Sequence, residues 1–254
     1  MTVNNESYGI AAEVAIAKSF NVKINECYVS RAEKETVELL LNNNNIKNIF
    51  LIENIPHPIR HIAENLNPID FILVGEKSLS VKTNIGKLGK VSPQNIGQPT
   101  CNTYFDYLEK YFKEKYTSNF SLENYLRDNN LRNDYNGKSI AFKQISIDFI
   151  DDVISMYWNN LFDCDYYLHF YNLKNRSDPI KNYICFKKSN PPIWNKELFT
   201  FTQSLLTWNE SNTVKYSGVS IGEFQVHKNR NCFKFRFNVD GIRKLISSQE
   251  ITIL

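Results

Sequence analysis

The chain has 254 residues, of which 42% are hydrophobic and 22% are charged, a composition typical of a core-forming globular protein. With 30 basic and 27 acidic side chains, its formal net charge of +3 excludes a histone-like cationic protein and an acidic tail protein. The contents of 9 glycines and 8 prolines exclude collagen-like and low-complexity architectures. Nucleic-acid binding is not excluded, because it depends on where the charge lies.

Five scattered cysteines, none of them in a C-x-x-C pair, argue against a disulfide framework and a zinc knuckle and favour a reducing compartment. The N-terminus lacks the basic and apolar regions of a signal peptide. No run approaches the roughly 18 apolar residues that a membrane span needs. We therefore expect a cytoplasmic protein with no membrane partner.

The beginning of the chain predicts helices around one strand. A helix is expected over residues 8–20, where apolar and small side chains recur at helical spacing around Glu13. A second, charged helix is expected over residues 31–41. The apolar run 46–52 is expected to form a buried strand, and residues 58–66 a short helix that begins with proline.

The next two apolar runs, residues 69–74 and 79–84, flank a Gly-Glu-Lys-Ser turn and predict a β-hairpin. On the second strand, Ser80 and Lys82 share one face because side chains alternate along a strand. Asp70 opens the first strand, so the hairpin is expected to bring Lys82 back towards it. A carboxylate and an ammonium then meet at one end of the hairpin.

The segment that follows the hairpin, residues 85–90, is rich in glycine and lysine and lacks acids. A loop of this composition lets a phosphodiester backbone approach closely. The candidate contacts in and after this loop are Lys87, Lys90, Gln94 and Gln98. The alternative is that these are ordinary solvated loop residues.

The rest of the chain predicts further helices followed by strands. The helices are expected over residues 101–116 and 147–161, and the strands over residues 166–171, 183–187, 199–202, 222–227 and 232–238. Because helices precede and flank strands in both halves, we expect a mixed α/β fold with a β-rich C-terminal region. A polar stretch over residues 129–137 suggests two regions, 1–135 and 136–254, packed as one unit.

Together, Pro68-x-Asp70 and a lysine, Lys82, on the second strand of the hairpin, after a helix that carries Glu13, resemble the PD-(D/E)xK nucleases. Among these, the pattern is most similar to the type II restriction endonucleases, over about residues 8–100. The resemblance implies a restriction-endonuclease-like central mixed sheet flanked by helices. It also implies that Asp70 binds Mg²⁺ and that Lys82 activates or orients water.

Ser80 departs from the family pattern, which usually has Glu or Asp at this position. A serine hydroxyl is neutral and a weak ligand, so the resemblance requires a second charged ligand from elsewhere. Glu13 is the leading candidate, because a glutamate on a comparable helix often lines the active site of this family; Glu76, in the hairpin turn, is less favoured. The alternative is that Asp70 ends a strand, Lys82 is an exposed strand lysine and Glu13 is a solvated helix residue.

The stretch 215–244 concentrates positive charge, with seven basic residues against two acids. Along residues 233–239 apolar and polar side chains alternate, so one face packs inward and the other presents hydrogen-bonding groups. A two-stranded ribbon of this kind fits the major groove of DNA, where Arg reads guanine and Asn or Gln reads adenine. The candidate contacts are Gln225, His227, Lys228, Arg230, Lys234 and Arg236. The alternative is an ordinary amphipathic surface hairpin.

The histidines suggest no metal site. His57 and His61 are four residues apart, but no third ligand completes a zinc site, so we expect exposed polar residues. His169, within an apolar run, is expected to be a core or strand histidine.

These patterns predict a Mg²⁺-dependent endonuclease of the restriction type that acts on double-stranded DNA, with a catalytic core over residues 1–135 and DNA recognition over residues 136–254. A palindromic target implies a homodimer with one site for each strand. One alternative is a non-catalytic DNA-binding protein that retains the fold, with Ser80 marking a degraded site. Another is a repair or mobile-element nuclease without strict sequence choice.

Overall fold

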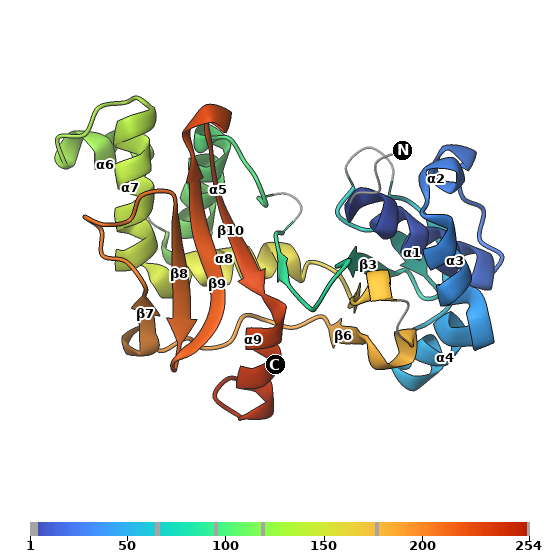
Figure 1. Cartoon of the computed structure of the whole chain (residues 1–254). Coiled ribbons are helices and arrows are strands. Elements are labelled where there is room, and N and C mark those ends of the chain that lie inside the picture. The colour runs from blue at the N-terminus through green and yellow to red at the C-terminus, as the bar shows by residue number, and fades with distance from the viewer. Residues whose placement is uncertain (1–4, 64–66, 94–95, 118–119, 176–177, 253–254) are drawn as a thin grey trace. The chain divides into compact units, whose positions relative to one another are not determined.

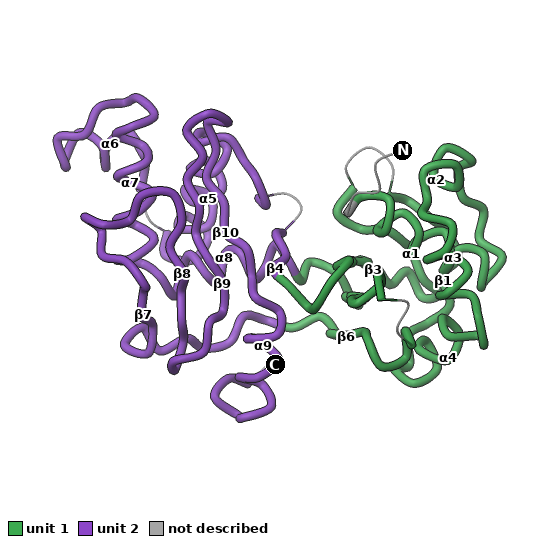
Figure 2. Tube along the Cα trace, in the orientation of Figure 1, with its two compact units in different colours: residues 1–89, 162–189 green, residues 90–161, 190–254 purple. Residues whose placement is uncertain are grey.

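The computed structural model describes residues 5–63, 67–93, 96–117, 120–175 and 178–252 of the chain (Figure 1). The chain forms two compact units, drawn in different colours in Figure 2. Unit 1 consists of residues 1–89 and 162–189, and unit 2 consists of residues 90–161 and 190–254. The boundary expected at residue 135 therefore lies inside unit 2. Packing of the two predicted regions as one unit stays a prediction.

Unit 1 is built on a mixed five-stranded sheet. Its helices are α1 (Asn5–Ser19), α2 (Glu26–Arg31), α3 (Lys34–Leu41) and α4 (Asn45–Ile52), with short 3-10 turns at Asn42–Asn44, Leu173–Asn175 and Pro179–Lys181. Its strands are β1 (Pro58–His61), β2 (Phe71–Leu73), β3 (Lys77–Thr83), β5 (Tyr166–Phe170) and β6 (Tyr183–Lys187). The strand order is β1-β2-β3-β5-β6, and all neighbours are antiparallel except β3 and β5, which are parallel.

The core of unit 1 lies between the sheet and its helices. Ala11, Ala12, Ala15 and Ala17 of α1 are completely buried, and α1 contacts β3. Small side chains permit this close approach of a helix to a sheet. The inward face of the hairpin supplies apolar side chains to the same core: Phe71, Leu73, Leu79 and Val81. The helix expected over residues 8–20 and the hairpin are confirmed.

Two expectations for unit 1 are wrong. The run 46–52 forms helix α4 rather than a strand. Its buried residues Ile49 and Phe50 follow the buried Ile46 by three and four positions, which is helical spacing, whereas Leu51 and Ile52 are exposed. Residues 58–61 form strand β1 rather than a helix. Proline is accepted there because β1 is an edge strand and Pro58 is its first residue.

Unit 2 contains an antiparallel sheet and a group of helices. Its helices are α5 (Cys101–Tyr116), α6 (Leu122–Asp128), α7 (Tyr135–Asp148), α8 (Ile150–Leu161) and α9 (Val239–Ser247), with short 3-10 turns at Lys196–Leu198 and Lys228–Arg230. Its strands are β4 (Lys90–Val91), β7 (Phe199–Phe201), β8 (Ser211–Tyr216), β9 (Val219–His227) and β10 (Cys232–Asn238). The strand order is β4-β10-β9-β8-β7. The two sheets with their helices confirm the mixed α/β class and the β-rich C-terminal region.

An aromatic core joins the sheet of unit 2 to its helices, and Figure 1 shows α5, α7 and α8 along one face of this sheet. Phe233 of β10 stacks on Phe142 of α7, with ring centroids 4.5 Å apart. Phe235 packs on Tyr157 of α8 and on Phe224 of β9. The apolar face of the predicted ribbon therefore points inward. No helix within the described ranges is long and apolar enough to cross a membrane.

Candidate functional site

Asp70 and Lys82 lie together on the β2–β3 hairpin. Gly75 and Glu76 turn the chain there with φ angles of 77° and 56°. Asp70 immediately precedes β2 and is buried, and its Oδ2 accepts a hydrogen bond of 2.5 Å from the backbone N–H of Val81. The Nζ of Lys82 is 3.6 Å from the same oxygen. The structure thus contains the carboxylate–ammonium pair that the sequence predicted.

Ser80 supports Asp70 without adding charge to it. Its hydroxyl is 3.2 Å from the carbonyl oxygen of Pro68 and 3.4 Å from Oδ2 of Asp70. Ser80 is buried, so this hydroxyl helps to fix the segment that enters β2. Because serine is neutral, a second negative charge beside Asp70 has to come from another element.

Glu13 of α1 supplies a second buried carboxylate. Its Oε2 is 2.7 Å from Nε2 of His61, which lies at the end of β1. The His61 side chain is only 2% exposed, and the rings of Tyr28 and Phe71 contact it edge-on, with centroids 4.9 and 5.0 Å away. The expectation that His61 is an exposed polar residue is therefore wrong. His61 is buried because it pairs with Phe71 across β1 and β2. This pairing was not predicted, since residues 58–66 were expected to form a helix.

The electrostatics link Glu13 to the hairpin. Burial raises the pKa of Glu13, and the negative charge of Asp70 raises it further, while the hydrogen bond from His61 and the charge of Lys82 act in the opposite direction. A buried carboxylate whose negative charge is disfavoured by a second carboxylate gains from a nearby cation. Glu13 and Asp70, from separate elements, therefore belong to one electrostatic cluster.

This donor set fits a hard divalent cation. Among the residues that the structure describes, no three His, Cys, Asp or Glu side chains are grouped to hold a metal ion. Mg²⁺, however, usually keeps several waters and takes only one or two protein carboxylates, together with substrate phosphates. Asp70 and Glu13 meet that requirement in chemistry, since both supply carboxylate oxygens.

His169 of β5 pairs in register with Lys82 and borders the same cluster. It is completely buried, and burial together with the charge of Lys82 lowers the pKa of His169 to about 3. Its Nε2 is 2.7 Å from Oδ1 of Asn84, and its Nδ1 is 3.2 Å from the hydroxyl of Tyr167. The expectation of a strand histidine in the core is confirmed, and His169 is neutral beside Lys82 near neutral pH.

The predicted glycine- and lysine-rich loop is divided between the two units. Lys87 is exposed in unit 1, beyond the end of β3. Lys90 belongs to β4 in unit 2 and forms an ion pair with Glu223. Gln98 is exposed in unit 2, and Gln94 lies outside the described residues. Phosphate contact by these candidates stays a prediction.

In unit 2 the ribbon has the predicted alternation. β9 and β10 are antiparallel, with Arg236 opposite Glu223 and Lys234 opposite Gln225. β4 pairs with the end of β10, so that Lys90 joins the same face. We call this surface the polar face; its residues are Lys90, Glu223, Gln225, His227, Lys234 and Arg236. Lys228 and Arg230 are exposed in the turn that joins β9 to β10.

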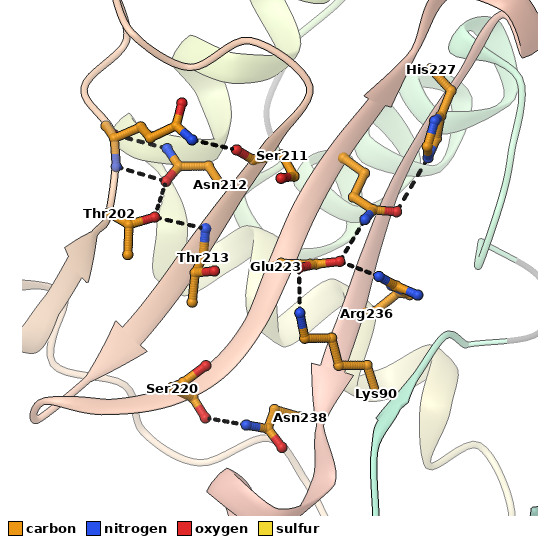
Figure 3. A network of polar contacts seen from close by, with 12 residues as sticks. Lys90, Thr202, Ser211, Asn212, Thr213, Ser220, Glu223, His227, Arg236 and Asn238 are labelled. Atoms are coloured by element: carbon orange, nitrogen blue, oxygen red, sulfur yellow. Dashed lines mark hydrogen bonds and ion pairs between the residues drawn. The ribbon is translucent and has the colours of Figure 1, made fainter. Parts of the chain in front are cut away.

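Figure 3 shows the polar contacts of this sheet. Glu223 is bonded to Lys90 and Arg236, and it accepts a hydrogen bond of 2.5 Å from Nε2 of Gln225 (Figure 3). Asn238 donates to the carbonyl oxygen of Ser220 at 3.0 Å. In the sequence Glu223 is only one of two acids within a basic stretch, whereas in the structure it lies at the centre of the polar face.

The electrostatics of the polar face follow from this arrangement. Burial alone raises the pKa of Glu223, but the hydrogen bonds from Lys90 and Arg236 outweigh it and hold the pKa below its usual value. Burial also lowers the pKa of Lys234, and the neighbouring charge of Arg236 lowers it further. The polar face therefore combines three basic side chains with one carboxylate, which bonds to two of them, Lys90 and Arg236.

Comparison with known proteins finds a relative, the type II restriction enzyme CviAII of Paramecium bursaria Chlorella virus 1, that is 29% identical over 186 residues. The chain is similar to a type II restriction enzyme. The match covers 73% of this chain and 46% of that enzyme, so the chain spans about half the length of the relative. No protein-family model matches the chain, and no solved structure matches it. This similarity agrees with the restriction endonuclease that the sequence resembled.

Proposed function

We propose that this chain is a Mg²⁺-dependent endonuclease that hydrolyses phosphodiester bonds of double-stranded DNA at a short specific sequence. One observation carries the proposal: the buried carboxylate of Asp70 is 3.6 Å from the ammonium of Lys82, and Glu13 adds a second carboxylate to the same electrostatic cluster. The similarity to a type II restriction enzyme supports the same reaction. Its place of action would be the cytoplasm.

Lys82 would supply a positive charge to the phosphate in the proposed reaction. Hydrolysis of a phosphodiester increases negative charge on the phosphate oxygens in the transition state, and a fixed positive charge stabilises it. The Lys82 side chain is 22% exposed, so a phosphate can reach the ammonium that Asp70 holds in place. Ser80 and the N–H of Val81 keep the Asp70 carboxylate oriented.

Asp70 and Glu13 would hold Mg²⁺ through their carboxylate oxygens. A bound Mg²⁺ supplies a Lewis acid for the phosphoryl oxygen and for the attacking water. Within the chain, His61 fixes the direction of the Glu13 carboxylate by its hydrogen bond of 2.7 Å. Glu13 then provides the negative charge that Ser80 does not supply.

The polar face of unit 2 would contact the DNA. Its arginine, lysine and glutamine side chains are the groups that bind guanine, phosphate and adenine. We further propose DNA contacts by exposed side chains outside this face: Lys228, Arg230 and Gln98 of unit 2, and Lys87 of unit 1. Gln94 remains a candidate from the sequence alone.

Digestion of plasmid DNA in the presence of Mg²⁺ tests the site. The wild-type chain should yield discrete fragments, whereas Asp70→Asn and Lys82→Met should leave the plasmid intact and still retard duplex DNA in a gel. Lys77→Met is the matched control, because Lys77 also lies on β3 and pairs with an aspartate, Asp165, at 3.0 Å. Normal cleavage by both site variants would refute the assignment.

The same digestion separates the alternatives. A smear of products would indicate a nuclease without sequence choice. An intact plasmid with a gel shift would indicate a DNA-binding protein that retains the fold, consistent with the neutral Ser80.

A palindromic cleavage site would make a homodimer the expected assembly, because the two-fold symmetry of the target matches that of two subunits. Sedimentation of the chain on its target duplex should then give two copies per site. One copy per site would contradict the dimer.

A further inference from the structure

We infer that Glu223 is a positioning residue that sets the donor and acceptor pattern of the polar face and thereby its DNA sequence preference. This inference rests on the proposed binding of DNA by that face. Glu223 would act through its neighbours rather than by touching a base itself.

Three strands direct polar side chains onto this one carboxylate. Lys90 comes from β4, Arg236 from β10 and Gln225 from β9 itself. Glu223 is 7% exposed, so its charge is largely removed from solvent and depends on these partners. The outer groups are more accessible: the side chains of Lys90 and Arg236 are 35% and 33% exposed. The buried carboxylate of Glu223 therefore holds two cations whose side chains are each about one third exposed.

Arg236 depends strongly on this anchor. Its Nη2 bonds to Oε1 of Glu223. Its Nε is buried and has no hydrogen-bond partner within the described part of the chain. Recognition of guanine by arginine requires a fixed guanidinium plane, because two N–H groups must meet two acceptors at once. Loss of the Glu223 charge would release that plane.

The same carboxylate fixes the polarity of the groups along β9. A carboxylate only accepts hydrogen bonds, so Gln225 must direct its amide N–H towards Glu223. The Gln225 Oε1 is then left facing Nε2 of His227, 3.2 Å away. Because this oxygen is an acceptor, Nε2 of His227 donates to it. One buried charge thus orders an amide and an imidazole in sequence.

Glu223→Gln tests the inference because it keeps the size of the side chain, removes the charge and allows an amide in the reverse polarity. The full chain would cleave a library of duplexes with randomised sequence in Mg²⁺, and sequencing of the product ends would give the base preference at each position. The expected result is a loss of preference of about tenfold at one or more positions. Binding to a labelled random duplex should become tighter, with a salt slope steeper by about one.

Asp240→Asn is the matched control. Asp240 of α9 also belongs to unit 2 and also pairs with two basic side chains, Arg243 and Lys244. Its removal changes the net charge equally but leaves the polar face intact, so the base preference should be that of the wild type. Glu223→Asp, which restores the charge one methylene shorter, should recover part of the preference.

The outcomes are distinct. An unchanged base preference in Glu223→Gln, or an equal change in Asp240→Asn, would overturn the inference while the cleavage itself still supported the proposed function. A purely structural role is recognised by less cleavage at an unaltered preference, and it would also overturn the inference. If the wild-type chain neither cuts nor binds duplex DNA, the proposed function fails and the inference fails with it.

Discussion

Acidification below about pH 6.5 is expected to destabilise the chain through His169. This imidazole is completely buried, and burial, together with the charge of Lys82, lowers its pKa from 6.5 to about 3. As the pH falls through 6.5, His169 is protonated in the unfolded chain, whereas in the folded chain it stays neutral down to about pH 3. Stability contributed by His169 is therefore complete above pH 6.5 and decreases below it. Within this window the slope approaches about 1.4 kcal/mol per pH unit.

His169→Gln removes this titration and keeps a neutral polar side chain beside Asn84 and Tyr167. The free energy of unfolding would be measured by urea denaturation, followed by circular dichroism, at several pH values between about 4 and 7. The comparison uses the slope against pH, in which all other titrating groups are common to both proteins. The variant should lose up to about 1.4 kcal/mol per pH unit of that slope.

His57→Gln, the same substitution at an exposed histidine, is the matched comparison for this experiment. An equal slope in the wild type and in His169→Gln would refute the reasoning that His169 stays neutral in the fold. A uniformly lower stability of the variant at every pH would not support the reasoning, because the test concerns the slope of the unfolding free energy against pH.

Three further predictions concern the candidate sites. His61→Phe keeps the ring contacts but leaves the Glu13 carboxylate without its partner, which should cost about 1–3 kcal/mol in urea denaturation; the cost should mostly vanish in a Glu13→Gln background, and an equal cost in both would contradict the pairing. Gly222→Ala should destabilise the chain by about 1–3 kcal/mol or more, as its Cβ would lie 2.3 Å from Cζ of Phe235; an unchanged melting temperature would disprove this close packing. Because the pKa of Glu223 is lowered in the fold, its ionised carboxylate stabilises the chain at pH values above the ordinary pKa of a glutamate, and this stability is lost as the pH falls through the carboxyl range. The melting temperature of Glu223→Gln should therefore fall less between neutral and acid pH than that of the wild type, and an equal fall in both proteins would contradict this.

Local patterns in the sequence were sufficient where the structure is local. The β2–β3 hairpin followed from two apolar runs and a glycine turn, and it brings Asp70 within 3.6 Å of Lys82. The alternation along β10 likewise predicted its inward aromatic and outward polar faces. In both cases the period of two along a strand is enough to assign the faces.

Contacts between distant segments could not be predicted from local patterns in the sequence. The run 46–52 is apolar enough for either a strand or a helix, and only tertiary packing decides in favour of α4. The contact between Glu13 and His61 joins residues 48 positions apart, and it required β1 to pair with β2 in a particular register. A single sequence contains no period that reports such a pairing.

The arrangement of the charged side chains is the feature that the sequence predicted least well. The count over residues 215–244 gave seven basic side chains against two acids and treated all of them alike. In the structure Glu223 is buried between two cations, while the basic pair beside Asp240 lies on α9. The positive charge presented by the sheet is therefore set by how Glu223 distributes its bonds. For a protein proposed to distinguish DNA sequences, that arrangement bears more directly on selectivity than the net charge, because phosphates respond to the total charge while base edges respond to geometry.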